Sequence, residues 1–169
     1  YPVSLEINNI LLVIFTLFIA GLFSGTISSL VTTIFLFSFF NIIDFSYYTI
    51  LTFLMFIFIY SFYAVADYIK NNDNKDPKEV VIDEVIGQAI PIYLYEISHG
   101  ANKNLEETFL YYICIFILFR FFDIKKPFPI NILDKRFKNS FGVIFDDVLA
   151  GIYVVLTLVI FMIIKTKFF

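Results

Sequence analysis

The chain has 169 residues, of which 60% are hydrophobic and 16% are charged, and its formal net charge is −3. A soluble domain is about half apolar and about a quarter charged, so this composition, with a mean hydropathy of +0.86, favours a polytopic membrane protein over a soluble helical one. The acidic balance gives no general attraction to nucleic acid. The single cysteine, Cys114, excludes an intramolecular disulfide and a cysteine-rich metal site.

Six apolar runs follow one another along the chain, and each is long enough to form a helix. They cover residues 10–23, 27–43, 47–66, 85–95, 109–122 and 148–164. Only 47–66 and 148–164 approach the roughly 20 residues that a membrane-spanning helix needs. The sequence therefore predicts an all-α fold, a small polytopic helical membrane protein with about four to six membrane-embedded helices. We expect residues 1–169 to form a single membrane domain.

Polar breaks separate the runs and predict how the chain is oriented. If the chain crosses the membrane from run to run, the breaks at 24–26, 67–84 and 123–147 lie on one side. That side holds nine of the twelve basic residues, namely Lys70, Lys75, Lys78, Arg120, Lys125, Lys126, Lys135, Arg136 and Lys138. By the positive-inside rule this side is cytoplasmic. We therefore expect a multi-pass protein whose active-site loops gather on the cytoplasmic face.

Two pairs of adjacent acids, Asp83-Glu84 and Asp146-Asp147, each precede an apolar run. Acids at the start of a helix can simply interact with the partial positive charge there, and this explanation stays open for both pairs. On one membrane face, however, four carboxylates would raise one another's pKa values, and a bound divalent cation removes that conflict. Mg²⁺ prefers carboxylate oxygens as ligands. The two pairs therefore indicate a magnesium site.

Basic residues follow the fifth apolar run. Arg120 and Asp123 are three positions apart and can form a plain intrahelical ion pair. Close to the membrane, however, the guanidinium fork of Arg120 also suits a phosphate. Lys126 precedes two prolines that stiffen the chain, so it can serve as a second phosphate contact, the alternative being attraction to anionic lipid headgroups. This mixture of acids and bases points to a metal ion and an anionic substrate at one site.

Two further patterns are weaker. Small and hydroxyl residues at 25–29 can serve helix packing or can lie near a phosphate. Cys114 and Arg120 have the spacing of a tyrosine-phosphatase loop, but the residues between them are apolar and include no glycine to let backbone amides surround an anion. His99 falls in a different polar break from the acids, so we interpret it as a loop residue.

Together these motifs resemble the bacterial phosphatidylglycerophosphatase A family. The resemblance rests on residues 24–30 (Ser-Gly-Thr-Ile-Ser-Ser-Leu), 81–87 (Val-Ile-Asp-Glu-Val-Ile-Gly), 119–130 (Phe-Arg-Phe-Phe-Asp-Ile-Lys-Lys-Pro-Phe-Pro-Ile) with Asp134, and 142–151 (Gly-Val-Ile-Phe-Asp-Asp-Val-Leu-Ala-Gly). The resemblance implies a small helical enzyme of the bacterial plasma membrane. Such an enzyme uses Mg²⁺ to remove the terminal phosphate of phosphatidylglycerophosphate, giving phosphatidylglycerol.

Our hypothesis for the site assigns nine residues to three roles. Mg²⁺ is bound by Glu84, Asp123 and Asp147; the phosphate is held by Arg120, Lys126 and Thr26; and Asp83, Asp146 and Asp134 are catalytic. The expected partners are an anionic phospholipid and the lipid bilayer, without nucleic acid, and the oligomeric state stays open. A small membrane transporter and another Mg²⁺-dependent lipid-headgroup enzyme are the alternatives. A transporter predicts acids inside the helices rather than at their ends.

Overall fold

The computed structural model describes residues 25–71, 81–99, 104–137 and 139–168. Within these ranges the regular elements are all α-helices and no strand occurs, which confirms the all-α prediction. The helices are α2 (Gly25–Asn41), α3 (Tyr47–Asn71), α4 (Ile82–His99), α5 (Leu105–Lys125), α6 (Ile130–Arg136) and α7 (Ser140–Phe168). The predicted run at 10–23 lies outside the described residues, and a total of four to six embedded helices stays a prediction.

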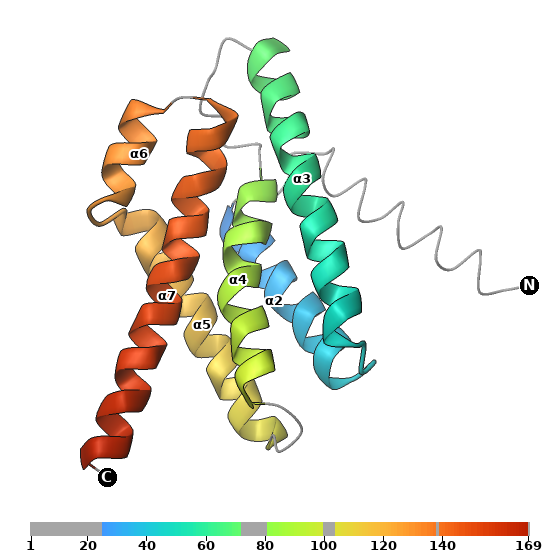
Figure 1. Ribbon diagram of the computed structural model, residues 1–169, viewed down its shortest axis with the longest axis vertical. Helices are drawn as coiled ribbons and strands as arrows, with labels where there is room; N and C mark the ends of the chain where they lie inside the picture. The colour runs from blue at the N-terminus through green and yellow to red at the C-terminus, as the bar shows by residue number, and fades with distance from the viewer. Residues whose placement is uncertain (1–24, 72–80, 100–103, 138, 169) are drawn as a thin grey trace, which may run out of the picture.

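Successive long helices run in opposite directions, so alternate connections come together in one half of the molecule (Figure 1). In this view α2, α4 and α7 run downward, whereas α3 and α5 run upward. The first turns of α2, α4 and α7 therefore lie in the upper half with the last turns of α3 and α5. The short α6 packs against α7 there. This is the convergence that the alternating polar breaks predict.

Polar side chains define where three of the helices begin. Ser46 accepts a first-turn N–H of α3 at 3.2 Å, and Asn104 accepts one of α5 at 3.1 Å. Asn139 accepts the N–H of Gly142 at 3.0 Å and so caps α7. Each of these oxygens replaces the carbonyl partner that a first-turn N–H lacks.

The start of α7 corrects one expectation from the sequence. The last apolar run was expected to begin at 148, with Asp146 and Asp147 at the helix start, but α7 begins at Ser140. The two acids therefore lie beyond the first turn, and the helix-start explanation does not apply to them. Asp83 and Glu84 do occupy the first turn of α4, where that explanation remains open.

Glycines bring the backbones of α4 and α7 into contact. A Cβ atom placed on Gly87 would lie 2.6 Å from the backbone oxygen of Asp147, and one placed on Gly151 would overlap the carbonyl of Gly87. Small residues at such crossings are common in membrane proteins, because they let helices pack through dispersion contacts. The crossing holds Asp147 directly against the helix that carries Asp83 and Glu84.

A line of hydrogen bonds, which we call the polar seam, joins the parallel helices α2 and α4. Its three bonds connect residues 53, 55 and 55 positions apart, so the pairing keeps nearly the same offset along the seam. They are Ser28 Oγ to Val81 O (3.0 Å), Gln88 Nε2 to Thr33 Oγ1 (3.0 Å) and Asn41 Nδ2 to Glu96 Oε1 (3.3 Å). Such bonds between membrane helices contribute about 0.6 kcal/mol on average and up to about 1.7 kcal/mol.

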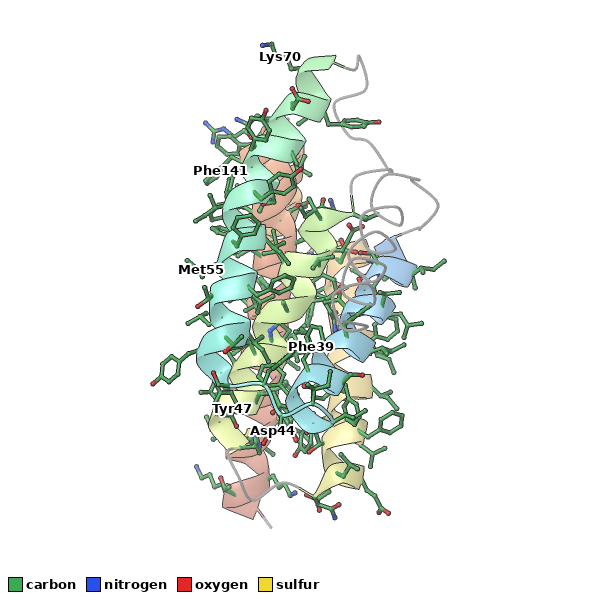
Figure 2. All side chains as sticks on the ribbon, turned by 90° about the vertical axis from the view of Figure 1, so that its right-hand side faces the viewer. Phe39, Asp44, Tyr47, Met55, Lys70 and Phe141 are labelled. Atoms are coloured by element: carbon green, nitrogen blue, oxygen red, sulfur yellow. The ribbon has the colours of Figure 1, made fainter. Side chains whose placement is uncertain are left out.

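Two of the described helices are long and apolar enough to cross a membrane, Tyr47–Lys70 within α3 and Ser140–Lys167 within α7. Only 17% and 22% of their most apolar windows are buried inside the protein. Figure 2 shows Tyr47 and Lys70 towards opposite ends of α3, with Met55 between them. At about 1.5 Å per residue, a helix of this length exceeds the hydrocarbon thickness of about 30 Å. Long apolar helices with outward-facing apolar side chains are the features of a membrane protein.

Candidate active site

Three carboxylates meet where α4 and α7 cross. Asp83 and Glu84 come from the first turn of α4 and Asp147 comes from α7, and one oxygen of each lies within 4.8 Å of the others. We call these three residues the acid cluster. Asp83 and Asp147 are buried and Glu84 is half-buried. The short α4–α7 distance that Gly87 permits is what brings the two helices' acids together.

Burial makes the negative charges of the acid cluster costly unless a cation or protons neutralise them. Burial, and then the charge of Glu84, raise the pKa of Asp83 well above its ordinary value. Burial also raises the pKa of Glu84, and the largest opposing effect is its hydrogen bond with the side chain of Asp83. The Oε2 atom of Glu84 is buried without a hydrogen-bond partner. A buried acceptor with neither proton nor partner destabilises the fold, and a divalent cation would satisfy it.

Arg120 lies beside the acid cluster and is already paired. Its Nη1 atom lies 2.6 Å from Oδ2 of Asp123, one turn further along α5, and each of the two side chains is 15% exposed. The same nitrogen lies 3.5 Å from the Ser29 hydroxyl on α2, while the Nε atom is buried without a hydrogen-bond partner. A side chain at Gly25 would overlap the carboxylate of Glu84 and lie 3.2 Å from Nη1 of Arg120. Because glycine has no side chain, both groups can approach α2.

Lys126 forms a second acid–base pair, with Asp146 of α7. Its ammonium lies 2.6 Å from Oδ2 of Asp146, and that carboxylate is 9% exposed. Lys126 ends α5 in the left-handed conformation, with φ of 42°, and its N–H donates to the carbonyl of Phe122 at 2.8 Å. This backbone geometry closes α5 at the residue before Pro127, and the side chain of Lys126 reaches α7 from there.

The structure brings together most of the predicted site residues but groups them differently. Glu84 and Asp147 lie in the acid cluster as expected for metal ligands, and Asp83 joins them although we expected it to be catalytic. Asp123 and Asp146 lie outside the cluster, each paired with a base. Their predicted roles as metal ligand and catalytic acid have no direct test here.

Two predicted residues remain, Thr26 and Asp134. Thr26 is exposed in the first turn of α2, which is helical there rather than a loop. Asp134 falls in α6, and its side chain is not among those that the structure describes. Among the described residues, the Thr26 side chain makes no hydrogen bond to the acid cluster.

Sequence reasoning missed the roles of two small residues. Ser29 is fully buried and reaches Arg120, and Gly87 sets the distance between α4 and Asp147. Ser29 belongs to the hydroxyl-rich stretch noted in the sequence, but spacing alone could not show that it, rather than Thr26, faces the site. The signal for Gly87 was its position three residues after an acid pair inside an apolar run.

Carboxylates that can hold a divalent cation, flanked by an arginine and a lysine that can hold a phosphate, define a site for phosphate-ester chemistry. An all-helical protein of membrane type that carries such a site is a candidate membrane-bound phosphohydrolase. The sequence profile of the family described as phosphatidylglycerophosphatase A matches residues 13–162. The chain therefore belongs to the phosphatidylglycerophosphatase A family.

Two curated relatives are similar to part of the chain. A phosphatidylglycerophosphatase A of Haemophilus influenzae is 41% identical over 81 residues, which cover 48% of this chain and 44% of the relative. A putative phosphatidylinositol-3-phosphatase of Bacteroides thetaiotaomicron is 40% identical over 79 residues, covering 47% of this chain and 45% of the relative. The chain thus spans less than half the length of each curated relative it matches. No solved structure matches the chain significantly.

Proposed function

We propose that this protein is a Mg²⁺-dependent lipid phosphatase that hydrolyses the terminal phosphate of phosphatidylglycerophosphate to give phosphatidylglycerol. The observation that carries the proposal is the acid cluster together with the Arg120–Asp123 and Lys126–Asp146 pairs, in a chain of the phosphatidylglycerophosphatase A family. The family and the relative from Haemophilus influenzae support the substrate.

The donor set of the acid cluster fits Mg²⁺. Its three carboxylates offer hard oxygen ligands within 4.8 Å of one another, and one of them has a buried oxygen without a partner. Mg²⁺ is usually held by few carboxylates and keeps several waters, which leaves room for phosphate oxygens. Glu84 and Asp147 would hold the ion, and Asp83 would lie beside it. When bound, the ion would neutralise phosphate charge and lower the pKa of a coordinated water.

The two basic residues Arg120 and Lys126 would hold the phosphate. Arg120 offers a planar pair of donors, of which Nε has no partner, and Lys126 offers a compact positive charge. Asp146 keeps the Lys126 ammonium at the site, because the two groups are 2.6 Å apart. Asp146 would therefore act by orienting Lys126 rather than by contacting the reacting atoms.

Asp83 is the residue best suited to exchange a proton during hydrolysis. A general acid or base must lie close to the atoms that exchange the proton, and an oxygen of Asp83 lies within 4.8 Å of oxygens of Glu84 and Asp147. Its backbone neighbour Glu84 donates an N–H to Asp83 Oδ1 at 3.1 Å, which fixes the orientation of this carboxylate. Asp83 could then accept a proton from the attacking water or return one to the leaving alkoxide.

The membrane would deliver the substrate. The acyl chains of the lipid stay in the bilayer, so the phosphate is presented at the interface, where the ends of the helices carry the site. The basic residues near this end favour a cytoplasmic orientation in a bacterial plasma membrane. We propose a multi-pass topology in which the bilayer and the anionic phospholipid are the partners.

Phosphate release from purified protein in mixed micelles tests the proposal. We expect turnover of phosphatidylglycerophosphate with Mg²⁺, loss of turnover with excess chelator, and slower turnover of soluble glycerol 3-phosphate. Phosphatidylinositol 3-phosphate is included as a substrate because of the name of the relative from Bacteroides thetaiotaomicron. Asp147→Asn should lower turnover at least about 100-fold, whereas the matched control Asp44→Asn, at an exposed position with φ of 59°, should not. Full activity in the presence of chelator would refute the metal assignment.

A further inference from the structure

We infer that the outer side of the segment from the end of α5 to α6 is a docking surface for anionic phospholipids. We call this surface the apolar rim; its side chains are 44–72% exposed and belong to Phe121, Ile124, Phe128 and Ile132. The inference rests on the proposed function and deepens it, because lipids held at the apolar rim would present their phosphates beside Arg120 and Lys126.

The end of α5 carries its site residues on the inside and apolar residues on the outside. The side chains of Arg120 and Asp123 are each only 15% exposed, and that of Lys126 is 29% exposed. Phe121 and Ile124, which alternate with them along the chain, are more than half exposed. A helix end in water has the reverse arrangement, whereas charged residues of membrane helices face the interior of the bundle. The outer side of this helix end therefore has the character of a lipid-facing surface.

Contacts with α7 place the connection between α5 and α6 at membrane depth. The hydroxyl of Tyr153 donates to the carbonyl of Phe128 at 2.6 Å, and the ring centroids of Tyr153 and Phe122 are 5.4 Å apart. Tyr153 lies near the middle of the candidate span Ser140–Lys167, about two turns further from the start of α7 than Asp146. The backbone at Phe128 is thus held beside the apolar part of α7, while its side chain is 72% exposed.

Helix α3 gives the same level for the adjacent acids. The ring of Phe62 lies 6.4 Å from the ring of Phe145, the residue before Asp146. Asp67, the first charged residue of α3, comes five residues after Phe62, which is about 7.5 Å further along the helix. The α7 acids are therefore level with apolar residues of α3. We expect acyl chains, rather than water, around an apolar rim at this level.

Two exposed cations make the apolar rim complementary to anionic lipid. Lys125 follows Ile124 in the last turn of α5, and Arg136 is the last residue of α6. Figure 1 shows the end of α5 and α6 on the same side of α7. Side chains of this kind lay their apolar stems along a hydrophobic surface and extend their charges to the headgroups. Each cation near an anionic surface favours binding about fivefold.

Tryptophan fluorescence can test this placement, because the chain contains no tryptophan of its own. Purified Phe128→Trp is placed in vesicles of phosphatidylcholine and phosphatidylglycerol whose acyl chains carry bromine at chosen depths. We expect the strongest quenching by bromines about 5–10 Å below the headgroups. Met55→Trp, between the two ends of α3, should respond most to bromines near the chain ends, and Lys70→Trp should respond to aqueous iodide (Figure 2). Ile124→Trp repeats the measurement from α5 itself.

The preference for anionic lipid is measured by placing the bromines on one lipid at a time. At equal mole fractions and low salt, brominated phosphatidylglycerol should be enriched at the tryptophan of Phe128→Trp at least about fivefold over brominated phosphatidylcholine. Adding Lys125→Gln and Arg136→Gln should bring this ratio close to one. Equal quenching by the two lipids in Phe128→Trp would overturn the anionic preference.

Other occupants of the apolar rim would give different signals. Quenching of Phe128→Trp and Ile124→Trp by iodide but not by brominated lipid would place the apolar rim in water and overturn the inference. Protection from both quenchers would mean that protein covers it, either another part of this chain or a second copy, and would overturn the inference too.

None of these measurements requires turnover, so they separate the inference from the proposed function. If phosphatidylglycerophosphate is hydrolysed but both tryptophans lie in water, only the docking surface is wrong. If brominated anionic lipid quenches as expected but no phosphate is released, the proposed function is wrong and the surface has no part in substrate delivery.

Discussion

The contact between Gly87 and Asp147 makes a quantitative prediction. In Gly87→Ala the new Cβ would lie 2.6 Å from the backbone oxygen of Asp147 and 2.7 Å from the ring of Phe119, whereas ordinary contacts begin at 3.4 Å. Both neighbours are held in place, one by its backbone and the other by complete burial. The distance to the Asp147 oxygen must grow from 2.6 Å to about 3.4 Å for an ordinary contact, so the helices must separate by about 0.8 Å.

Two effects on stability partly cancel in this variant. Alanine in place of glycine favours the helix by about 0.5–1 kcal/mol, whereas overpacking costs about 1–3 kcal/mol. We therefore expect a loss of at most about 2.5 kcal/mol, which leaves most of the protein folded. Catalysis should suffer more, because a misplacement of about 1 Å at a catalytic group can lower the rate about 100-fold.

Phosphate release from phosphatidylglycerophosphate, measured beside thermal unfolding and Mn²⁺ binding, is the assay for Gly87→Ala. Ser98→Ala is the matched control, since it places the same residue at an exposed position of α4. We expect the control to stay within about twofold of the wild-type rate, as surface substitutions usually change stability little. Turnover of Gly87→Ala within threefold of the wild-type rate, with unchanged Mn²⁺ affinity, would refute the link between the helix crossing and the site.

Three further predictions follow from the acid–base pairs, the acid cluster and the polar seam. Lys126→Ala should lower kcat/KM about 10- to 150-fold, as expected for a charge-assisted hydrogen bond of about 1.5–3 kcal/mol, and adding Asp146→Asn should lower it little further, since both residues act on one contact. In the presence of chelator, the melting temperature should fall as the pH rises above the ordinary carboxyl range. The reason is that the raised pKa values of Asp83 and Glu84 make the folded state bind protons more tightly than the unfolded state does. Mg²⁺ should remove this pH dependence. A melting temperature that rises over this range would contradict the raised values. Tyr112→Phe removes the hydroxyl that donates to the buried Glu96 at 2.7 Å, and should lower the free energy of unfolding by about 1–3 kcal/mol without changing KM, measured by denaturation and steady-state kinetics.

The sequence predicted the long helices because apolar composition is sufficient to mark them. The run 47–66 begins where α3 begins, at Tyr47, although α3 continues to Asn71 through polar residues that the run could not include. The start of α7 was placed too late for the same reason, since 140–147 contains polar side chains. Asn139 was the missed signal, because it is a good N-cap residue and does cap α7. The short α6 lay hidden inside a polar break.

The sequence also predicted that acids and bases converge, but not how they pair. Alternation of the helices was enough to place Asp83, Asp147 and Arg120 in one half of the molecule. The pairing of Lys126 with Asp146 depends on the left-handed turn at Lys126, and the position of Asp147 depends on the crossing at Gly87. Both are three-dimensional contacts between distant segments, which spacing along the chain does not specify.

The polar seam has a consequence for biogenesis. At about 5–20 residues per second, the α4 partners of α2 emerge from the ribosome roughly 3–11 seconds after it. During this interval α2 can satisfy four of its six hydroxyls, because Ser29, Thr32, Thr33 and Ser38 donate to carbonyls one turn earlier in the same helix. The helix α2 can therefore satisfy these hydroxyls by itself until α4 is synthesised, after which Ser28 and Asn41 bond to Val81 and Glu96.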